Sequence, residues 1–365
     1  MTEDNSLSAR YIAHSAGALA GYAAGELLHA QPDLADGLGP APMERWRQVF
    51  LQCLEELAAA LVANRPGLFV DYALWMRALL RSRGMPDGGL EAALDSLCRV
   101  LAAELPAEAA RAATGACRDA LNALEAAGEA SDARLTTDSA EGRLAAGYLL
   151  ALLEGDRTRA TRLILDAAEA GTPVADLYLK VLLPAQEEAG RMWQGAEINV
   201  AEEHFATNTT RSVMAQLARY APDKEPNGKA MLASAVAGNQ HDLGVQAVAE
   251  FFEMAGWRVI QLGADLPIPD LVQAVDFYRA DLLCLSVALR SQLATLKQTI
   301  EAVRLSERGR VVKILVGGRA LRGNADLADT LGADGYAPAP PEAVALGNAL
   351  VGLDRDGRPF TGTEH

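Results

Sequence analysis

The sequence predicts three domains, two of them all-helical and the third a doubly wound α/β domain built on a parallel sheet. Apolar residues recur at three- and four-residue steps as far as about Tyr220, which is the period of amphipathic helices. From Lys229, short apolar runs alternate with helical stretches, which is typical of a parallel sheet covered on both faces. Polar segments separate these blocks, and the expected domains are residues 1–131, 137–222 and 229–355.

The first domain is predicted from helical periodicity and from residues that end helices. Gly84 and Pro86 end one amphipathic stretch, as glycine and proline commonly do. The expected helices cover residues 11–29, 46–61, 69–80, 90–101 and 106–124.

The third domain is predicted from five strand-like runs. Right-handed crossovers between parallel strands give a doubly wound, flavodoxin-like sheet. The expected strands are Ala230–Ala237, Arg258–Leu262, Leu282–Val287, Val311–Val316 and Ala333–Tyr336.

Composition restricts the class of partner. The formal net charge of −15 over 365 residues argues against direct binding to nucleic acid, which needs clustered Lys and Arg. Residues 1–8 are polar and acidic rather than a signal peptide, and no apolar run approaches the roughly 18 residues that span a bilayer. The four cysteines lack metal-ligand spacing and indicate free thiols in a reducing compartment. We therefore expect a cytoplasmic protein.

The first chemical signal is a histidine in the loop after the first strand. His241 lies in the segment Asn239-Gln-His-Asp-Leu-Gly244, at the carboxyl rim of the sheet, where such folds bind large cofactors. Asn239 and Asp242 are short polar groups that can orient the imidazole, as a metal-ligating histidine requires. Gly244 lets the backbone turn tightly into the next helix. A single histidine in such a loop is, by itself, more often a plain loop residue than a ligand.

Two further elements end neighbouring strands at the same rim. Ser286 and Leu289 follow the third strand, and Gly317-Gly318 ends the fourth. Paired glycines usually mean a tight turn, but they also allow a ligand to approach the backbone closely.

Together these elements resemble the cobalamin-binding domain shared by methionine synthase, mutases and corrinoid proteins. That family's signature is Asp (or Glu)-x-His-x-x-Gly, then Ser-x-Leu, then Gly-Gly. The resemblance implies that His241 replaces the nucleotide base as lower ligand to cobalt, and that the nucleotide tail runs beside Ser286 and Gly317-Gly318. Asn239 stands where the family usually has a carboxylate, which should make His241 a less basic ligand.

The second helical block has the length of the four-helix bundle that family members place over the upper face of the cofactor. Its Trp193, Val200, Glu203 and His204 resemble the set that surrounds the adenosyl group in light-sensing adenosylcobalamin photoreceptors. The resemblance implies that His204 moves to the upper face of cobalt after photolysis. The plain alternative is that Trp193 fills the core and that Glu203 and His204 form a solvated helix face.

The first domain resembles the degenerate globin of photocobilins, which join a bilin-binding domain to a cobalamin module. A bilin needs an apolar slot with aromatic walls, and cations for its propionates. The structural alternative is that the aromatic residues are core and the arginines a solvated face. The candidate walls are Trp46, Tyr72 and Trp75, and the candidate cations are Arg77, Arg81 and Arg83.

The predicted function is that of a photoreceptor, not an enzyme, which signals to a partner protein when light breaks the cobalt–carbon bond of adenosylcobalamin. The resemblance also implies a bilin, biliverdin being the expected one, and a homo-oligomer. One alternative is a corrinoid protein serving a methyltransferase. Others are a cobalamin-responsive regulatory protein without a light role and, for the first domain, a dimerisation bundle.

Overall fold

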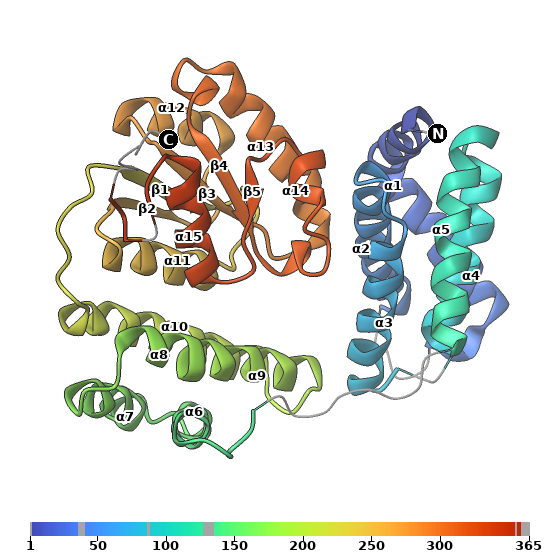
Figure 1. Ribbon diagram of the computed structural model, residues 1–365. Helices are drawn as coiled ribbons and strands as arrows, with labels where there is room; N and C mark the ends of the chain where they lie inside the picture. Colours follow the sequence, from blue (N-terminus) through green and yellow to red (C-terminus); the bar gives the residue numbers. More distant parts are fainter. Residues whose placement is uncertain (1, 36–40, 86–87, 127–134, 355, 359–365) are drawn as a thin grey trace. The chain divides into compact units, whose positions relative to one another are not determined.

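The computed structural model describes the 365-residue chain except residues 1, 36–40, 86–87, 127–134, 355 and 359–365. The chain divides into two compact units (Figure 1). Unit 1 comprises Met1–Ser131 with Gln194–Ala196, and unit 2 comprises Asp132–Trp193 with Glu197–His365.

Unit 1 is all-helical in its described residues, as predicted. Its opening helix starts earlier than expected, at Thr2, and Pro42 begins the second helix, where its missing N–H costs nothing. The elements are α1 (Thr2–Ala30), η1 (Pro32–Ala35), α2 (Pro42–Val62), α3 (Gly67–Ser82), α4 (Gly89–Glu104) and α5 (Ala107–Ala126). The globin-like arrangement of these helices stays a prediction.

Unit 2 begins with the predicted helical block. Ser139, Asp156 and Asn199 each accept a hydrogen bond from the first turn of the helix that follows them, which satisfies backbone N–H groups that a helix leaves unpaired. A π-helical segment joins α8 and α9 without a break, so the block has four helical rods. The elements are α6 (Ala140–Leu153), α7 (Arg157–Glu169), α8 (Val174–Leu177), η2 (Tyr178–Leu182), α9 (Leu183–Gln194), α10 (Val200–Leu217) and η3 (Ala218–Tyr220).

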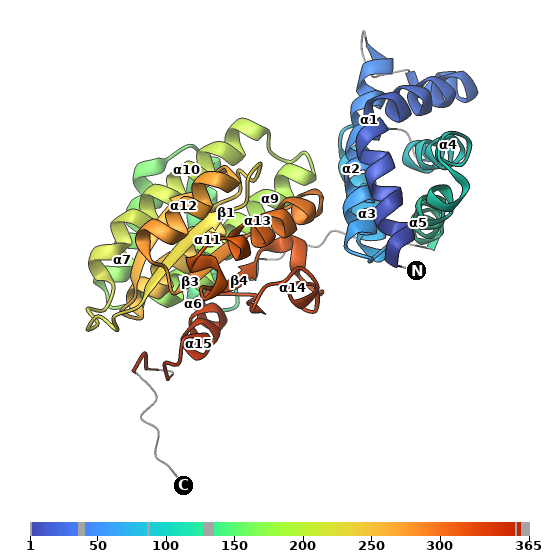
Figure 2. The same ribbon diagram turned by 90° about the horizontal axis from the view of Figure 1, so that it is seen from above.

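The rest of unit 2 is the predicted five-stranded parallel sheet, in the order β2-β1-β3-β4-β5. This is the flavodoxin-like order, and Figures 1 and 2 show helices on both faces of the sheet. The strands are β1 (Ala230–Ala235), β2 (Arg258–Gly263), β3 (Leu282–Ser286), β4 (Lys313–Gly317) and β5 (Gly335–Tyr336). The helices are α11 (Leu243–Met254), α12 (Ile268–Tyr278), α13 (Leu293–Leu305), α14 (Leu327–Thr330) and α15 (Pro340–Leu350), with short turns η4 (Arg290–Gln292), η5 (Arg308–Arg310) and η6 (Arg319–Leu321).

The helical block and the sheet pack against each other within unit 2. Phe251 of α11 belongs to the same buried cluster as the core of the block, and its ring meets that of Tyr178 edge-on at 5.9 Å. Two ion pairs also join the block to loops at the carboxyl rim of the sheet: Arg211 with Asp242, and Glu187 with Arg322. The carboxyl rim, where the predicted site lies, therefore faces α9 and α10.

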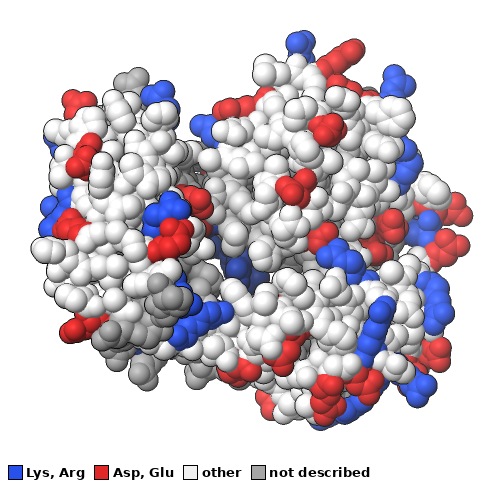
Figure 3. Space-filling view, turned by 180° about the vertical axis from the view of Figure 1, so that it is seen from behind, with Lys and Arg blue, Asp and Glu red and all other residues white. Residues whose placement is uncertain are grey.

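The cysteines are free thiols, as the sequence predicts. Burial raises the pKa of Cys53 to about 12. Among the described residues, no helix combines the length and the apolar character needed to cross a membrane. On the face drawn in Figure 3, acidic and basic side chains are interspersed.

Candidate functional site

The site is built on the loop that leaves the central strand β1. All six residues of β1 are buried, because the strand lies between β2 and β3 and has helices on both faces. The backbone N–H of Val236 donates to the carbonyl oxygen of Ser286, so the loop starts out bonded to the end of β3. It then passes through Gly238, which has a φ of +78°, and brings His241 to the rim.

Asn239 fixes the orientation of His241. Its side chain is fully buried, and its Nδ2 donates to the carbonyl oxygen of Ser286 at 3.2 Å. The amide oxygen must then face the other way, where it accepts from the backbone N–H of His241 at 3.0 Å and lies 3.3 Å from Nδ1 of the ring. An amide oxygen can only accept, so Nδ1 carries the proton and Nε2 keeps its lone pair. This tautomer can ligate a metal through Nε2.

The charge state of His241 suits ligation as well. Loss of solvation around the ring lowers its pKa, and the nearby Arg319 lowers it further, whereas Glu203 and Asp242 act in the opposite direction. The net shift is downward and favours the neutral imidazole that metals bind. The influence of Glu203 also shows that the first turn of α10 lies close to the rim.

Asp242 does not orient the imidazole, contrary to the prediction. Its carboxylate accepts two hydrogen bonds from the guanidinium of Arg211 on α10, at 2.8 and 3.0 Å, and its side chain is 8% exposed. This bidentate geometry is among the stronger forms of ion pair. Asp242 therefore ties the histidine loop to the helical block.

The glycines of the site differ in what they do. Gly318 has a φ of +106°, and a Cβ there would lie 2.2 Å from the carbonyl oxygen of Val287, so only glycine fits. Gly244 is different: it lies inside the first turn of α11 without a positive φ, and no atom lies within 4 Å of where its Cβ would be. Gly244 lies where the loop enters the helix, as predicted, but the turn itself does not require glycine, and the open space beside it fits the approach of a ligand.

Ser286, Leu289 and Gly317 meet at the rim as predicted. Ser286 and Gly317 are paired across β3 and β4, and Leu289 lies three residues further along, partly exposed. The leucine thus stands one position later than in the Ser-x-Leu signature. A short 3-10 turn follows it, in which Gln292 accepts a hydrogen bond from the backbone N–H of Leu289.

The candidate cap residues lie at the start of α10 and the end of α9. Val200 is an exposed apolar side chain, 55% accessible, in the first turn of α10. His204 is 70% exposed and its Nδ1 lies 2.7 Å from a carboxylate oxygen of Glu203. Trp193 packs against the core of the helical block, in line with its structural alternative.

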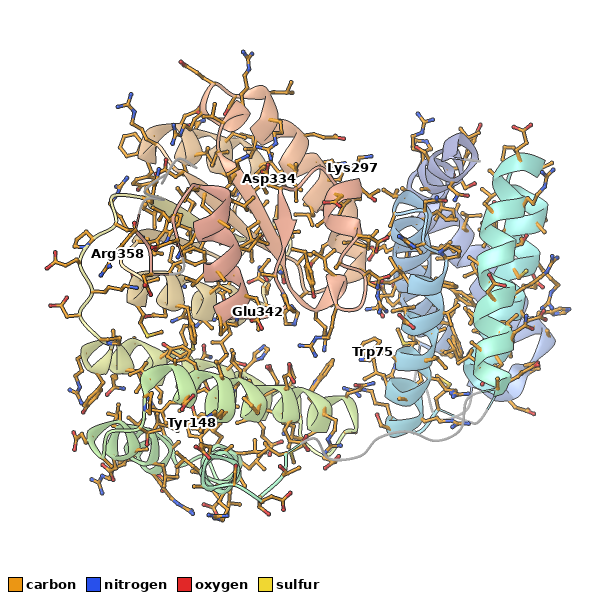
Figure 4. All side chains as sticks on the ribbon, viewed as in Figure 1. Trp75, Tyr148, Lys297, Asp334, Glu342 and Arg358 are labelled. Atoms are coloured by element: carbon orange, nitrogen blue, oxygen red, sulfur yellow. The ribbon has the colours of Figure 1, made fainter. Side chains whose placement is uncertain are left out.

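A chain of polar side chains supports Glu203, and sequence reasoning missed it. The hydroxyl of Thr207 lies 2.8 Å from Glu203 and 3.1 Å from Gln186, whose amide donates to Thr210. Thr210 in turn bonds the buried hydroxyl of Tyr148, which Figure 4 labels on α6. The four-residue spacing of Glu203 and Thr207 could have indicated the first link.

The candidate bilin residues in unit 1 have structural roles in part. Trp46 is fully buried and its ring N–H donates to the carbonyl oxygen of Leu34, and Arg77 donates to that of Leu124. Trp46 and Arg77 therefore fit the structural alternative. The ring of Tyr72 lies 6.0 Å from that of Trp75, labelled on α3 in Figure 4, with an angle of 33° between the ring planes, and Tyr72 is 7% exposed. Arg81 and Arg83 lie at the exposed end of α3.

Among the described residues, no group of three His, Cys, Asp or Glu side chains could hold a bare metal ion. A corrin would suit this rim, because it brings its own metal and would need a single nitrogen from the protein, which Nε2 of His241 could supply. A doubly wound sheet with one oriented histidine at its carboxyl rim, open space beside Gly244 and a helical block above defines a cobalamin-binding protein.

Comparisons with known proteins agree. Two models of a B12 binding domain match residues 228–345 and 144–218, the sheet and the helical block. A dimethylamine corrinoid protein of Methanosarcina mazei is 30% identical over 116 residues, which cover 32% of this chain and 68% of that protein. The chain belongs to the family of cobalamin-binding corrinoid proteins.

Two longer matches each cover more than half of this chain. A corrinoid protein of Desulfitobacterium hafniense is 27% identical over 207 residues, or 55% of this chain and 94% of that protein. The solved structure of the monomethylamine corrinoid protein of Methanosarcina barkeri covers 58% of this chain and 99% of its own, with a TM-score of 0.51 at 21% identity, and so shows a shared fold.

Proposed function

We propose that this chain is the corrinoid protein of a methyltransferase system, which holds cobalamin between its helical block and its sheet and presents the cofactor to a partner enzyme. One observation carries the proposal: 207 residues of this chain match 94% of the length of a corrinoid protein. In this proposal the partner enzyme recognises the methyl donor, and this chain supplies the cofactor site.

In this proposal, different residues of unit 2 bind different parts of the cofactor. When bound, cobalamin supplies a cobalt centre that can carry a methyl group. His241, held by the amide of Asn239, would bind the cobalt through Nε2. The glycine backbone at Gly318 would leave room for part of the cofactor. Val200 and His204, exposed at the start of α10, would lie against the bound cofactor.

A spectroscopic experiment tests the lower ligand. Protein labelled with nitrogen-15 is loaded with hydroxocobalamin and reduced to cobalt(II), and the electron paramagnetic resonance spectrum is recorded. Ligation by His241 gives splitting into doublets from labelled nitrogen, whereas the unlabelled base of the cofactor gives triplets. His241→Ala should abolish the doublets and weaken cobalamin binding by more than about tenfold. Doublets that persist in this variant would remove His241 from its role.

The carrier role is tested in the dark. Loaded and fully reduced protein should take up a methyl group from methyl iodide, and a spectrum recorded before and after the addition measures the uptake. A loaded protein that takes up no methyl group, or a purified protein that binds no corrin, would refute the proposal.

A second candidate function is the light-sensing one, with adenosylcobalamin as the bound form. It is supported by Val200, Glu203 and His204, which together present an apolar, an acidic and an imidazole group at the exposed start of α10. Green light should then convert the spectrum of adenosylcobalamin-loaded protein to that of cobalt(III), and His204→Ala should remove the light-state histidine ligation. The same illumination of free adenosylcobalamin is the control. If the loaded protein shows no spectral change other than that of the free cofactor, this function is excluded.

A bilin in unit 1 belongs to the same candidate. It is supported by the position of Tyr72, whose buried ring lies 6.0 Å from the ring of Trp75. Co-expression with a biliverdin source should give an absorption band in the red or far red. Purified protein that shows corrin bands alone would exclude the bilin.

A further inference from the structure

The loop that carries His241 contains one flexible residue, Gly238. Gly238 is exposed, has a φ of +78°, and has open space where a Cβ would lie. Glycine has the largest conformational freedom to lose on folding, so the path of this loop depends on groups that grip it from outside. Asn239 orients the ring of His241, and the outside groups hold the backbone that carries both residues.

Asp265, in the loop after β2, forms two hydrogen bonds with the loop that carries His241. One carboxylate oxygen accepts the backbone N–H of Gly238 at 2.7 Å, and the other accepts the side-chain amide of Gln240 at 3.1 Å. The loop residue next to His241 and the residue three before it are thus bound to one carboxylate. Hydrogen bonds to an ionised carboxylate are shorter and stronger than neutral ones.

The backbone at Asp265 is itself unusual. Its φ is +54°, in the left-handed region that non-glycine residues seldom adopt, although aspartate tolerates it better than most. Such strain persists where the surroundings fix it and is common near functional sites. Here the strained residue lies in the loop after β2, and its side chain reaches across to the loop after β1.

Gln292 grips the same glycine from the side of β3. Its Nε2 donates to the carbonyl oxygen of Gly238 at 3.0 Å, while its Oε1 accepts from the backbone N–H of Leu289. Gln292 is 8% exposed. Both backbone groups of Gly238 are therefore bonded to side chains from two different loops, one on each side of β1.

We propose that Asp265 is a positioning residue for the lower ligand, which acts through Gly238 and Gln240 to aim the imidazole of His241 out of the rim. The inference rests on the proposed ligation of cobalt by His241. Gln292 provides the opposing contact, so that the loop is preformed before the cofactor arrives.

The experiment uses the full chain with nitrogen-15 label, hydroxocobalamin as the probe, and reduction to cobalt(II). Asp265→Gly removes the carboxylate and relieves the left-handed backbone, so the variant should fold at least as well as the wild type. We expect its dissociation constant for hydroxocobalamin to rise about tenfold and its doublet signal to be largely replaced by triplets from the cofactor's own base. Asp265→Asn keeps an oxygen for Gly238 and should restore both readouts.

Asp270→Ala is the matched control, because it removes an exposed carboxylate from the first turn of α12, just beyond the same loop. It should leave affinity and splitting unchanged. Doublets and affinity in Asp265→Gly equal to those of the wild type would overturn the role of Asp265 alone. Triplets in the wild-type protein would instead remove His241 as the ligand, and the role of Asp265 with it.

Discussion

At the scale of single residues, the site depends on small groups that leave space or supply one hydrogen bond. Asn239 offers the imidazole an oxygen without a charge, and it does so because its amide nitrogen is already committed to Ser286. A carboxylate at this position could not donate to that carbonyl. The asparagine that replaces the carboxylate of the family signature therefore makes a hydrogen bond to the last residue of β3. The sequence alone could not reveal this contact.

Gly318 should be among the least replaceable residues of the rim. Its φ of +106° and ψ of +166° lie in a region that is essentially confined to glycine, and a Cβ would meet the carbonyl oxygen of Val287. Gly318→Ala should lower the free energy of unfolding by about 3 kcal/mol or more, as measured by urea denaturation. Gly323→Ala is the control, because its φ is also positive but its Cβ would have open space, and it should cost about 1 kcal/mol. Equal losses in the two variants would contradict the clash.

At the scale of elements, α10 combines two tasks on one helix. Its first turn exposes Val200 and His204, and two turns later Arg211 binds Asp242, the residue after His241. Any movement of α10 along the rim must therefore either break this ion pair or pull on the loop of the proposed ligand. The helix thus links the exposed residues Val200 and His204 to the loop of the proposed ligand.

A double-mutant cycle on Arg211→Ala and Asp242→Ala should measure this connection. The carboxylate is nearly buried while Arg211 keeps 39% of its side chain exposed, so we expect a coupling of about 1 kcal/mol in the free energy of unfolding after allowing for solvent screening. The pair Arg159 and Glu154, both about half exposed, serves as the control and should couple well below that. A coupling no larger than that of the control pair would show that the bridge contributes nothing to docking.

At the scale of the whole molecule, the sequence predicted the helices of the first unit and the elements of the α/β half, while the globin-like arrangement of the first unit stays a prediction. The change of period at Lys229 and the turn residues after each strand gave all five strands and their doubly wound order, with small errors at the ends. Val311, for instance, is exposed and precedes β4 rather than opening it. Strands and helices can be predicted because the spacing of apolar residues within a short segment indicates each of them.

Contacts between distant segments could not be read in this way. Asp242 looked like a partner for His241 because the two are adjacent, but the folded chain brings it Arg211, 31 residues away. The grip of Asp265 on Gly238 likewise joins loops that only the sheet order places side by side. The sequence thus located the candidate ligand at the rim and one group that orients it, Asn239, but not the contacts of Asp265 and Gln292 with the loop.

The edge-on meeting of Tyr178 and Phe251 has a consequence for how a partner could reach the cofactor. These rings belong to one continuous apolar cluster. The helical block therefore cannot separate from the sheet without exposing this cluster to water. A partner should therefore gain access through a small rotation of the helical block about the contact of Tyr178 with Phe251. For the same reason, the helical block and the sheet should unfold together in one cooperative thermal transition.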